Sequence, residues 1–333
     1  MKVEINRKNE IEVEMIFEIG KEEIEEEKKR VINEIKKDAE VEGFRKGKVP
    51  EDIIEKKFQD LIKENIFKNI VSRSYVETFK KENFTPIIEP EIYDVEFTDE
   101  KLSFKIGIEL KPNVEIKKYK GINVKKVEPK KVEEKDVENA LKELEKRPEF
   151  AASIIDLEKR NMWKKRIREE LEAREIEKAK IEEENQLWDQ LFKNSKFVLP
   201  EKLINKRASK YTEYQLRRID LRGKTKEEIE NYANEIFKIV KPYAENEVKK
   251  YFILDKIAEI ENIEVDEKEI DERIEIFSRN LGKPFDEIKN ELLKNGEIEN
   301  IRDEIRIDKA YKIVKENINY IERIVLPGEN KKI

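Results

Sequence analysis

The residues best suited to contact a partner form one octet, Gly43-Phe44-Arg45-Lys46-Gly47-Lys48-Val49-Pro50. Three cations fall within six positions with no acidic residue among them, and an aromatic ring stands beside them. Two glycines permit backbone angles that other residues resist, so the segment can turn sharply and present its side chains. The candidate binding residues are Gly43, Phe44, Arg45, Lys46, Gly47, Lys48 and Pro50.

Elementary physics gives this octet two interpretations. If it is exposed, the cations can meet phosphate groups while the Phe44 ring enters an apolar slot or stacks on a base, as on a ribonucleoprotein surface. If Phe44 turns inward, it anchors an ordinary basic surface loop to its own domain. The residues by themselves leave both interpretations open.

The chain contains no cysteine and no histidine, which restricts the kinds of catalytic and metal sites that it can form. Their absence excludes disulfides, thiolate nucleophiles, a Ser-His-Asp triad and the usual zinc ligands. Carboxylates, lysines and tyrosines could still move protons, but 45% of the residues are charged, so these groups occur in nearly every segment. An enzyme is therefore disfavoured, and the sequence predicts no catalytic residue, cofactor site or metal site.

The elements around the octet follow from the spacing of apolar residues. Alternation predicts strands or a hairpin over residues 3–19 and two more strands over 91–97 and 101–110. Helical spacing predicts helices over 21–41 and 51–81, with the octet in the loop between them. Residues 1–112 are thus expected to form an α+β domain of antiparallel strands with two helices.

The remainder of the chain is predicted to be mostly helical. Residues 113–150 form a linker with an extended segment and a short helix over 132–146, which Pro148 ends. Residues 151–333 form an elongated helical body, starting with a long, highly charged helix over 153–193. Further helices are expected after Pro200, over 241–260, over 266–280, over 284–294 and from 297 to about 321. Pro242 is expected to kink or divide the helical stretch over 241–260. Residues 330–333 are expected to be frayed.

Charge is divided unevenly between these regions. Residues 1–112 hold 22 basic and 28 acidic side chains, and the remaining 50 of each sign cancel, so the whole net charge of −6 belongs to the first domain. The near balance of charges argues against a general nucleic-acid coat protein. A local argument for nucleic-acid binding comes from one basic run: Lys202, Lys206, Arg207, Lys210, Arg217, Arg218 and Arg222.

The chain also lacks the run of about 20 apolar residues that a membrane-spanning helix needs, so we expect a cytoplasmic protein with no membrane partner.

The octet resembles the G-F-R-x-G-x-x-P signature of the trigger factor family, bacterial chaperones that dock beside the ribosomal tunnel exit. The position of the octet between two helices of an α+β domain is similar to the position of the signature in that family. The segment Leu187 to Arg207, where one helix ends and another begins after Pro200, resembles the family's C-terminal domain. The resemblance implies that Phe44, Arg45 and Lys46 contact a large-subunit ribosomal protein and nearby ribosomal RNA. It also implies that the helical body shields unfolded nascent chains.

One feature departs from the family pattern. Typical members carry an FKBP-like prolyl isomerase domain between the linker and the helical body. Here the linker helix ends near Phe150 and a helical pattern resumes by Ser153, which leaves no room for a domain. The sequence therefore resembles a trigger factor without the isomerase module, and we expect a holdase without catalysis of its own.

Three alternatives to the holdase remain at this stage: a prolyl isomerase, a helical scaffold or interaction protein, and a nucleic-acid binder. A homodimer away from the ribosome is also left open. Aromatic residues dispersed among charges suit weak contacts with clients, but packing between helices is the simpler explanation for any one of them. These aromatic residues are Trp163, Trp188, Phe192, Phe197, Tyr211, Tyr214, Phe237, Tyr243, Phe252, Phe277 and Phe285.

Overall fold

The structure is a computed structural model that describes residues 1–147, 149–150 and 157–321. Contacts along the chain divide it into two compact units, each built from two segments. The first unit combines Met1–Asn113 with Phe197–Val248, and the second combines Val114–Lys196 with Lys249–Ile333. The functional division into a head over 1–112, a linker over 113–150 and a body over 151–333 remains a prediction.

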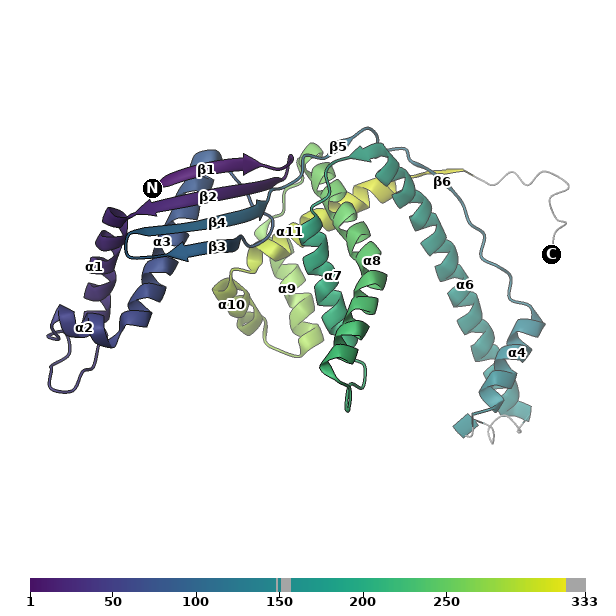
Figure 1. The fold of residues 1–333 in the computed structure, drawn as a ribbon. Helices are drawn as coiled ribbons and strands as arrows, with labels where there is room; N and C mark the ends of the chain where they lie inside the picture. Colours follow the sequence, from purple (N-terminus) through teal and green to yellow (C-terminus); the bar gives the residue numbers. More distant parts are fainter. Residues whose placement is uncertain (148, 151–156, 322–333) are drawn as a thin grey trace. The chain divides into compact units, whose positions relative to one another are not determined.

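A four-stranded antiparallel sheet forms the base of the first unit (Figure 1). Its strands are β1 (Lys2–Arg7), β2 (Glu12–Gly20), β3 (Glu91–Phe97) and β4 (Lys101–Glu109), in the spatial order β1-β2-β4-β3. Side chains along β2 alternate between buried and more exposed positions, because successive residues of a strand point to opposite faces. Phe17 of β2 and Phe104 of β4 are direct partners in the register, and their rings stack with centroids 4.9 Å apart.

Three helices pack on the apolar face of this sheet. They are α1 (Lys21–Asp38), α2 (Glu51–Lys57) and α3 (Gln59–Glu82). Val31, Ile54 and Ile70, one from each helix, are completely buried in the same core as the sheet residues. The prediction of one continuous helix over 51–81 is wrong at Phe58, where the backbone leaves the helical region (φ −120°, ψ 27°) while the side chain packs against the core.

Two helices from later in the sequence complete the first unit. They are α7 (Glu201–Leu216) and the first part of α8 (Lys226–Ile260), which continues into the second unit. The prediction that Pro242 could divide this region is wrong, because α8 runs through it without a break. A proline removes one intrahelical hydrogen bond, and the packed, buried Ala244 and Val248 stabilise the helix that follows it.

The second unit is built on the 38-residue helix α6 (Leu157–Asn194). The linker contributes β5 (Glu115–Ile116), β6 (Asn123–Lys125) and α4 (Glu134–Glu145). α4 packs against α6 around the fully buried Val137 and Leu141 (Figure 1). The other elements are β7 (Ser195–Lys196), α9 (Glu267–Leu281), α10 (Phe285–Asn295), α11 (Ile298–Glu316) and β8 (Asn319–Ile321).

Short strands tie the linker to the rest of the second unit. β5 pairs with β7 in antiparallel fashion, and β6 pairs with β8 in parallel. The prediction of a helix from 297 to about 321 is therefore wrong at its end, since α11 stops at Glu316 and the chain joins β6 as a strand. The predicted start of the long helix at Ser153 and the predicted fraying of 330–333 lie outside the described residues.

The predicted fold class is confirmed: an N-terminal antiparallel sheet with helices on one face precedes a mostly helical region.

Candidate functional site

The octet forms the loop between α1 and α2, and buried valines hold both of its ends. Val41 is 7% exposed and Val49 is 0% exposed, and both belong to the core beneath the sheet. Pro50 follows at once as the N-cap residue of α2, and its carbonyl accepts a hydrogen bond from Ile54 N at 3.1 Å. The loop is thus fixed at its two ends and leaves the core between them.

Two tight turns shape the loop. The Phe44 N–H donates to the Val41 carbonyl at 3.0 Å, and the Lys48 N–H donates to the Arg45 carbonyl at 2.9 Å. Gly43 (φ +87°) and Gly47 (φ +79°) occupy the left-handed region that glycine favours. A Cβ at either glycine would meet no atom within 4 Å, so the backbone angle rather than crowding explains the residue type.

The Phe44 side chain lies at the surface, with 41% of the residue exposed. This exposure removes the inward-anchor interpretation, because Val41 and Val49 do the anchoring instead. Arg45 and Lys48 are also exposed, and neither forms an ion pair within the part of the chain that the structure describes. The loop therefore presents an aromatic ring and two unpaired cations to a partner.

Lys46 differs from its neighbours because it has an acidic partner. Its ammonium lies 2.9 Å from the Asp38 carboxylate at the end of α1, and this hydrogen bond raises the pKa of Lys46 above its ordinary value. Asp38 lies outside the octet, so counting charges within the octet could not reveal the pair. The side chain of Lys46 is still 60% exposed, which leaves the ammonium accessible to a second anion.

Helix α1 is held against α2 and α3 by a set of polar contacts. The buried Glu27 accepts from Asn69 at 3.0 Å and from Arg73 at 3.1 Å, both on α3. Lys28 and Glu55 join α1 to α2 at 3.3 Å. These contacts, together with the shared core, join the two helices that carry the loop to the rest of the domain.

Family models match both parts of the chain. Residues 1–144 match the model described as bacterial trigger factor protein (TF), and residues 162–316 match the model of the bacterial trigger factor protein (TF) C-terminus. The chain belongs to the trigger factor family.

Individual relatives agree with this membership. The trigger factor of Geotalea uraniireducens (strain Rf4) is 33% identical over 146 residues, which cover 44% of this chain and 34% of that protein. The trigger factor of Natranaerobius thermophilus is 30% identical over 152 residues, which cover 45% of this chain and 34% of that protein. The chain thus matches about a third of the length of these curated relatives.

A solved structure shares the fold. It is described as "Promiscuous Substrate Recognition in Folding and Assembly Activities of the Trigger Factor Chaperone", and it matches 95% of this chain and 99% of its own with a TM-score of 0.55. The two sequences are 16% identical, so this likeness concerns the fold alone.

In this member of the trigger factor family, the regions that match the two family models are separated by a short segment. Only residues 145–161 separate the matched regions. An independently folded domain usually needs about 50 residues or more, so an isomerase domain does not fit there.

Some aromatic side chains of the helical region are buried between helices, and others are exposed to solvent. Trp188 and Phe252 are 4% and 2% exposed, so they belong to the core of the second unit. Tyr214 and Tyr243, in the first unit, are 59% and 58% exposed. Sequence reasoning could not separate these two groups, because each aromatic residue stands among similar charged neighbours.

The described residues offer neither a metal site nor a membrane-spanning helix. Among the described residues, no group of three or more Asp or Glu side chains is arranged to hold a metal ion. No helix in the described ranges combines the length and the apolar character that crossing a membrane requires.

Proposed function

We propose that this protein is a ribosome-associated chaperone that docks through the loop Gly43–Pro50 and shields nascent chains without catalysis of its own. The exposed Phe44 ring beside Arg45 is the observation that carries the proposal. An aromatic ring can enter an apolar slot on a ribosomal protein, and a guanidinium can bind phosphate through two hydrogen bonds. The proposed partners are a large-subunit protein at the tunnel exit and nearby ribosomal RNA, which places the protein in the cytoplasm.

Exposed apolar side chains on α7 and α8 support the holdase part of the proposal. Tyr214, Ile239 and Tyr243 are between 58% and 76% exposed and lie among charged residues. Contacts of this kind are dispersed, so they can hold an unfolded segment weakly and release it. The proposed clients are unfolded nascent polypeptides of no fixed sequence.

The absence of catalysis is proposed from the length of sequence between the two matched segments. Since residues 145–161 are too few for an isomerase domain, we expect no acceleration of a proline-limited refolding reaction. An acceleration at catalytic concentrations of this protein would contradict this part of the proposal.

The docking proposal is tested by co-sedimentation with ribosomes. The variant Phe44→Ala/Arg45→Ala/Lys46→Ala should lose ribosome binding while its circular dichroism stays unchanged. A matched control is Leu61→Ala/Lys63→Ala/Lys68→Ala, which removes one exposed apolar residue and two exposed cations from α3. Undiminished binding of the loop variant, or equal loss in the control, would reject the loop as the docking site.

The shielding proposal is tested separately by the aggregation of an unfolded protein. The intact chain should slow aggregation, and Tyr214→Ser/Ile239→Ser/Tyr243→Ser should slow it less while binding ribosomes normally. No effect of the intact chain on aggregation would refute the holdase role but not the docking site.

A further inference from the structure

The linker carries a dense run of lysines that neither the loop nor the helices explain. Residues 114–131 contain seven lysines and two glutamates, in a chain whose net charge is −6. Six of the lysines occur as three adjacent pairs, Lys117-Lys118, Lys125-Lys126 and Lys130-Lys131. We call residues 117–131 the lysine strap.

The six lysines that occur as adjacent pairs are all exposed, and none has an acidic partner among the described residues. Lys120, the seventh, forms an ion pair with Glu261 at 2.6 Å. None of the other six makes an ion pair within residues 1–147, 149–150 and 157–321. Nearby cations of α6 behave differently, since Arg160 and Lys164 both bind carboxylates of α4. Among the described residues, the strap thus leaves six lysines outside any ion pair in a region where ion pairs are common.

The backbone of the strap is already bound by α6. The Gln186 side chain accepts from Lys125 N at 2.9 Å and donates to the Lys125 carbonyl at 3.2 Å. Glu183 accepts from Val127 N at 2.8 Å, and Asn194 donates to the Lys118 carbonyl at 3.2 Å. Glu183, Gln186 and Asn194 lie three, eight and eleven positions apart, so they share one face of the helix. Because these backbone groups are occupied, a partner at this part of the strap meets lysine side chains rather than a free strand edge.

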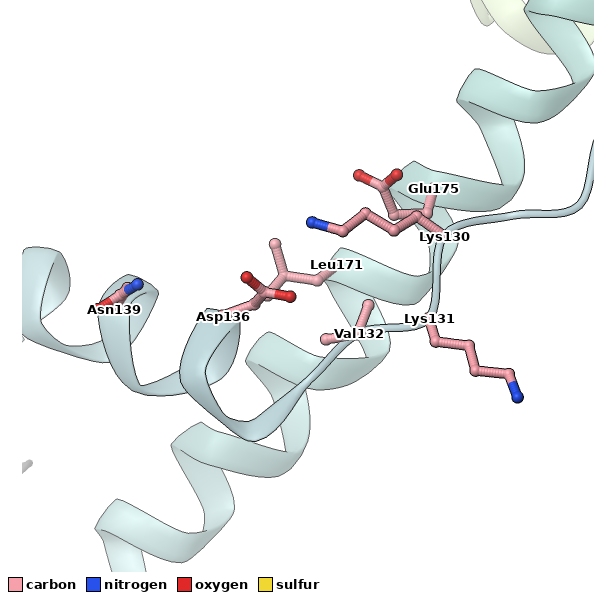
Figure 2. A pocket seen from close by; sticks show the side chains of 7 residues that line it. All are labelled: Lys130, Lys131, Val132, Asp136, Asn139, Leu171 and Glu175. Carbon is pink, nitrogen blue, oxygen red and sulfur yellow. The ribbon is translucent and has the colours of Figure 1, made fainter. Parts of the chain in front are cut away.

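A small hollow at the end of the strap does not account for the lysines. It has a volume of about 240 Å³, and its lining includes the carboxylates of Asp136 and Glu175 (Figure 2). Lys130 extends over this hollow toward α6, whereas Lys131 points away from it. Since acidic groups line the hollow, an anion is better placed along the strap than inside it.

We propose that the lysine strap binds the phosphate backbone of RNA. Fifteen extended residues span at most about 50 Å, which is long enough for several successive phosphates. Lysine ammonium groups bind phosphates as point charges, without the planar geometry that arginine requires. A polypeptide that binds by adding a strand needs an open backbone edge, and α6 already occupies much of that edge.

This surface is independent of the loop Gly43–Pro50. It belongs to the second unit, whereas the loop belongs to the first. Its ligand is recognised by charge, whereas the loop offers an aromatic ring as well. The strap can therefore be tested on free RNA, without ribosomes.

The test is fluorescence anisotropy of a labelled 20-nucleotide single-stranded RNA titrated with the full chain at several salt concentrations. Replacing the six strap lysines by Gln should weaken binding at low salt at least tenfold. It should also reduce the slope of log K against log salt by up to about 4, since each phosphate contact in a single strand contributes about 0.7. The matched control replaces six exposed lysines outside the strap by Gln: Lys142, Lys165, Lys180, Lys268, Lys294 and Lys312. It makes the same change in net charge and should keep affinity within threefold of the wild type.

Three results would overturn the proposal: no RNA binding by the wild type, equal loss in the strap and control variants, or displacement of RNA by polyglutamate as readily as by unlabelled RNA. The last result would identify an acidic protein surface as the partner. The variant Phe44→Ala/Arg45→Ala/Lys46→Ala should bind this RNA within threefold of the wild type, so failure at the loop and failure at the strap can be told apart. Circular dichroism of each variant establishes that the fold is retained.

Discussion

The carboxylate of Glu109 receives the first backbone N–H groups of α7: Leu203 N donates to one oxygen at 2.9 Å and Lys202 N to the other at 2.8 Å. Glu109 is the last residue of β4 and is 0% exposed. The first N–H groups of a helix lack intrahelical partners, and its N-terminus carries a partial positive charge. Glu109 thus joins the sheet to α7, a helix 93 residues later in the chain.

Removing this carboxylate should destabilise the first unit. Glu109→Ala leaves two N–H groups unpaired in a buried setting, which costs about 1–3 kcal/mol. We expect a lower denaturation midpoint in urea, measured by circular dichroism. Glu89→Ala is the control, because the Glu89 side chain is 92% exposed and its ion pair with Lys206 contributes little. Equal midpoints for Glu109→Ala and Glu89→Ala would show that the contact does not stabilise the fold.

Glu109 should also make stability depend on pH. Burial raises the pKa of this carboxyl above its ordinary value of 4.5, against the lowering effect of the two N–H donors. The folded state then binds a proton more readily than the unfolded state, so this group's contribution to stability falls as pH rises from 4.5 through the raised pKa. Glu109→Gln removes the titration. The difference in unfolding free energy between wild type and Glu109→Gln should therefore change across that interval and be constant below it. A constant difference throughout would contradict the raised pKa.

The loop glycines should be sensitive to alanine. At Gly43 (φ +87°) and Gly47 (φ +79°) a side chain finds open space but an unfavourable backbone angle, which costs about 1–2 kcal/mol. Gly43→Ala should lower the melting temperature or rearrange the loop and weaken ribosome co-sedimentation. Gly20→Ala is the matched control, since Gly20 also has open space but a φ of −85°. If the two alanine variants behave alike, the left-handed angle is not what the loop requires.

The α6 side chains that bind the linker backbone, Glu183, Gln186 and Asn194, should control how firmly the linker is held. Gln186→Ala removes two hydrogen bonds to the Lys125 backbone, each with a net contribution of about 1 kcal/mol. Hydrogen exchange in the peptide that contains β6 should accelerate about thirtyfold, as measured by mass spectrometry. Glu182→Ala, at an exposed position of the same helix, should leave that exchange unchanged. Protection that survives Gln186→Ala would mean that pairing with β8 holds the strap without α6.

Much of the fold could be predicted because local pattern decides it. Apolar alternation placed the strands of the sheet, and helical spacing placed α1, α4 and α9 to within a few residues. Errors arose where distant segments compete with local preference. At the end of α11, pairing of Asn319–Ile321 with β6 replaces the expected last helical turn. At Pro242, packing preserves a helix that the residue type alone would break.

The amino-acid sequence alone is sufficient to identify the octet, its two glycines and the shortage of residues for a domain between the linker and α6. These features depend on residue type and on order along the chain. The folded structure is needed to know that Phe44 is exposed, that Asp38 pairs with Lys46, that Glu109 caps α7 and that six lysines of the strap have no acidic partner among the described residues. These four features depend on where the chain turns and on which side chains come into contact after folding. A count of charges along the sequence contains neither kind of information.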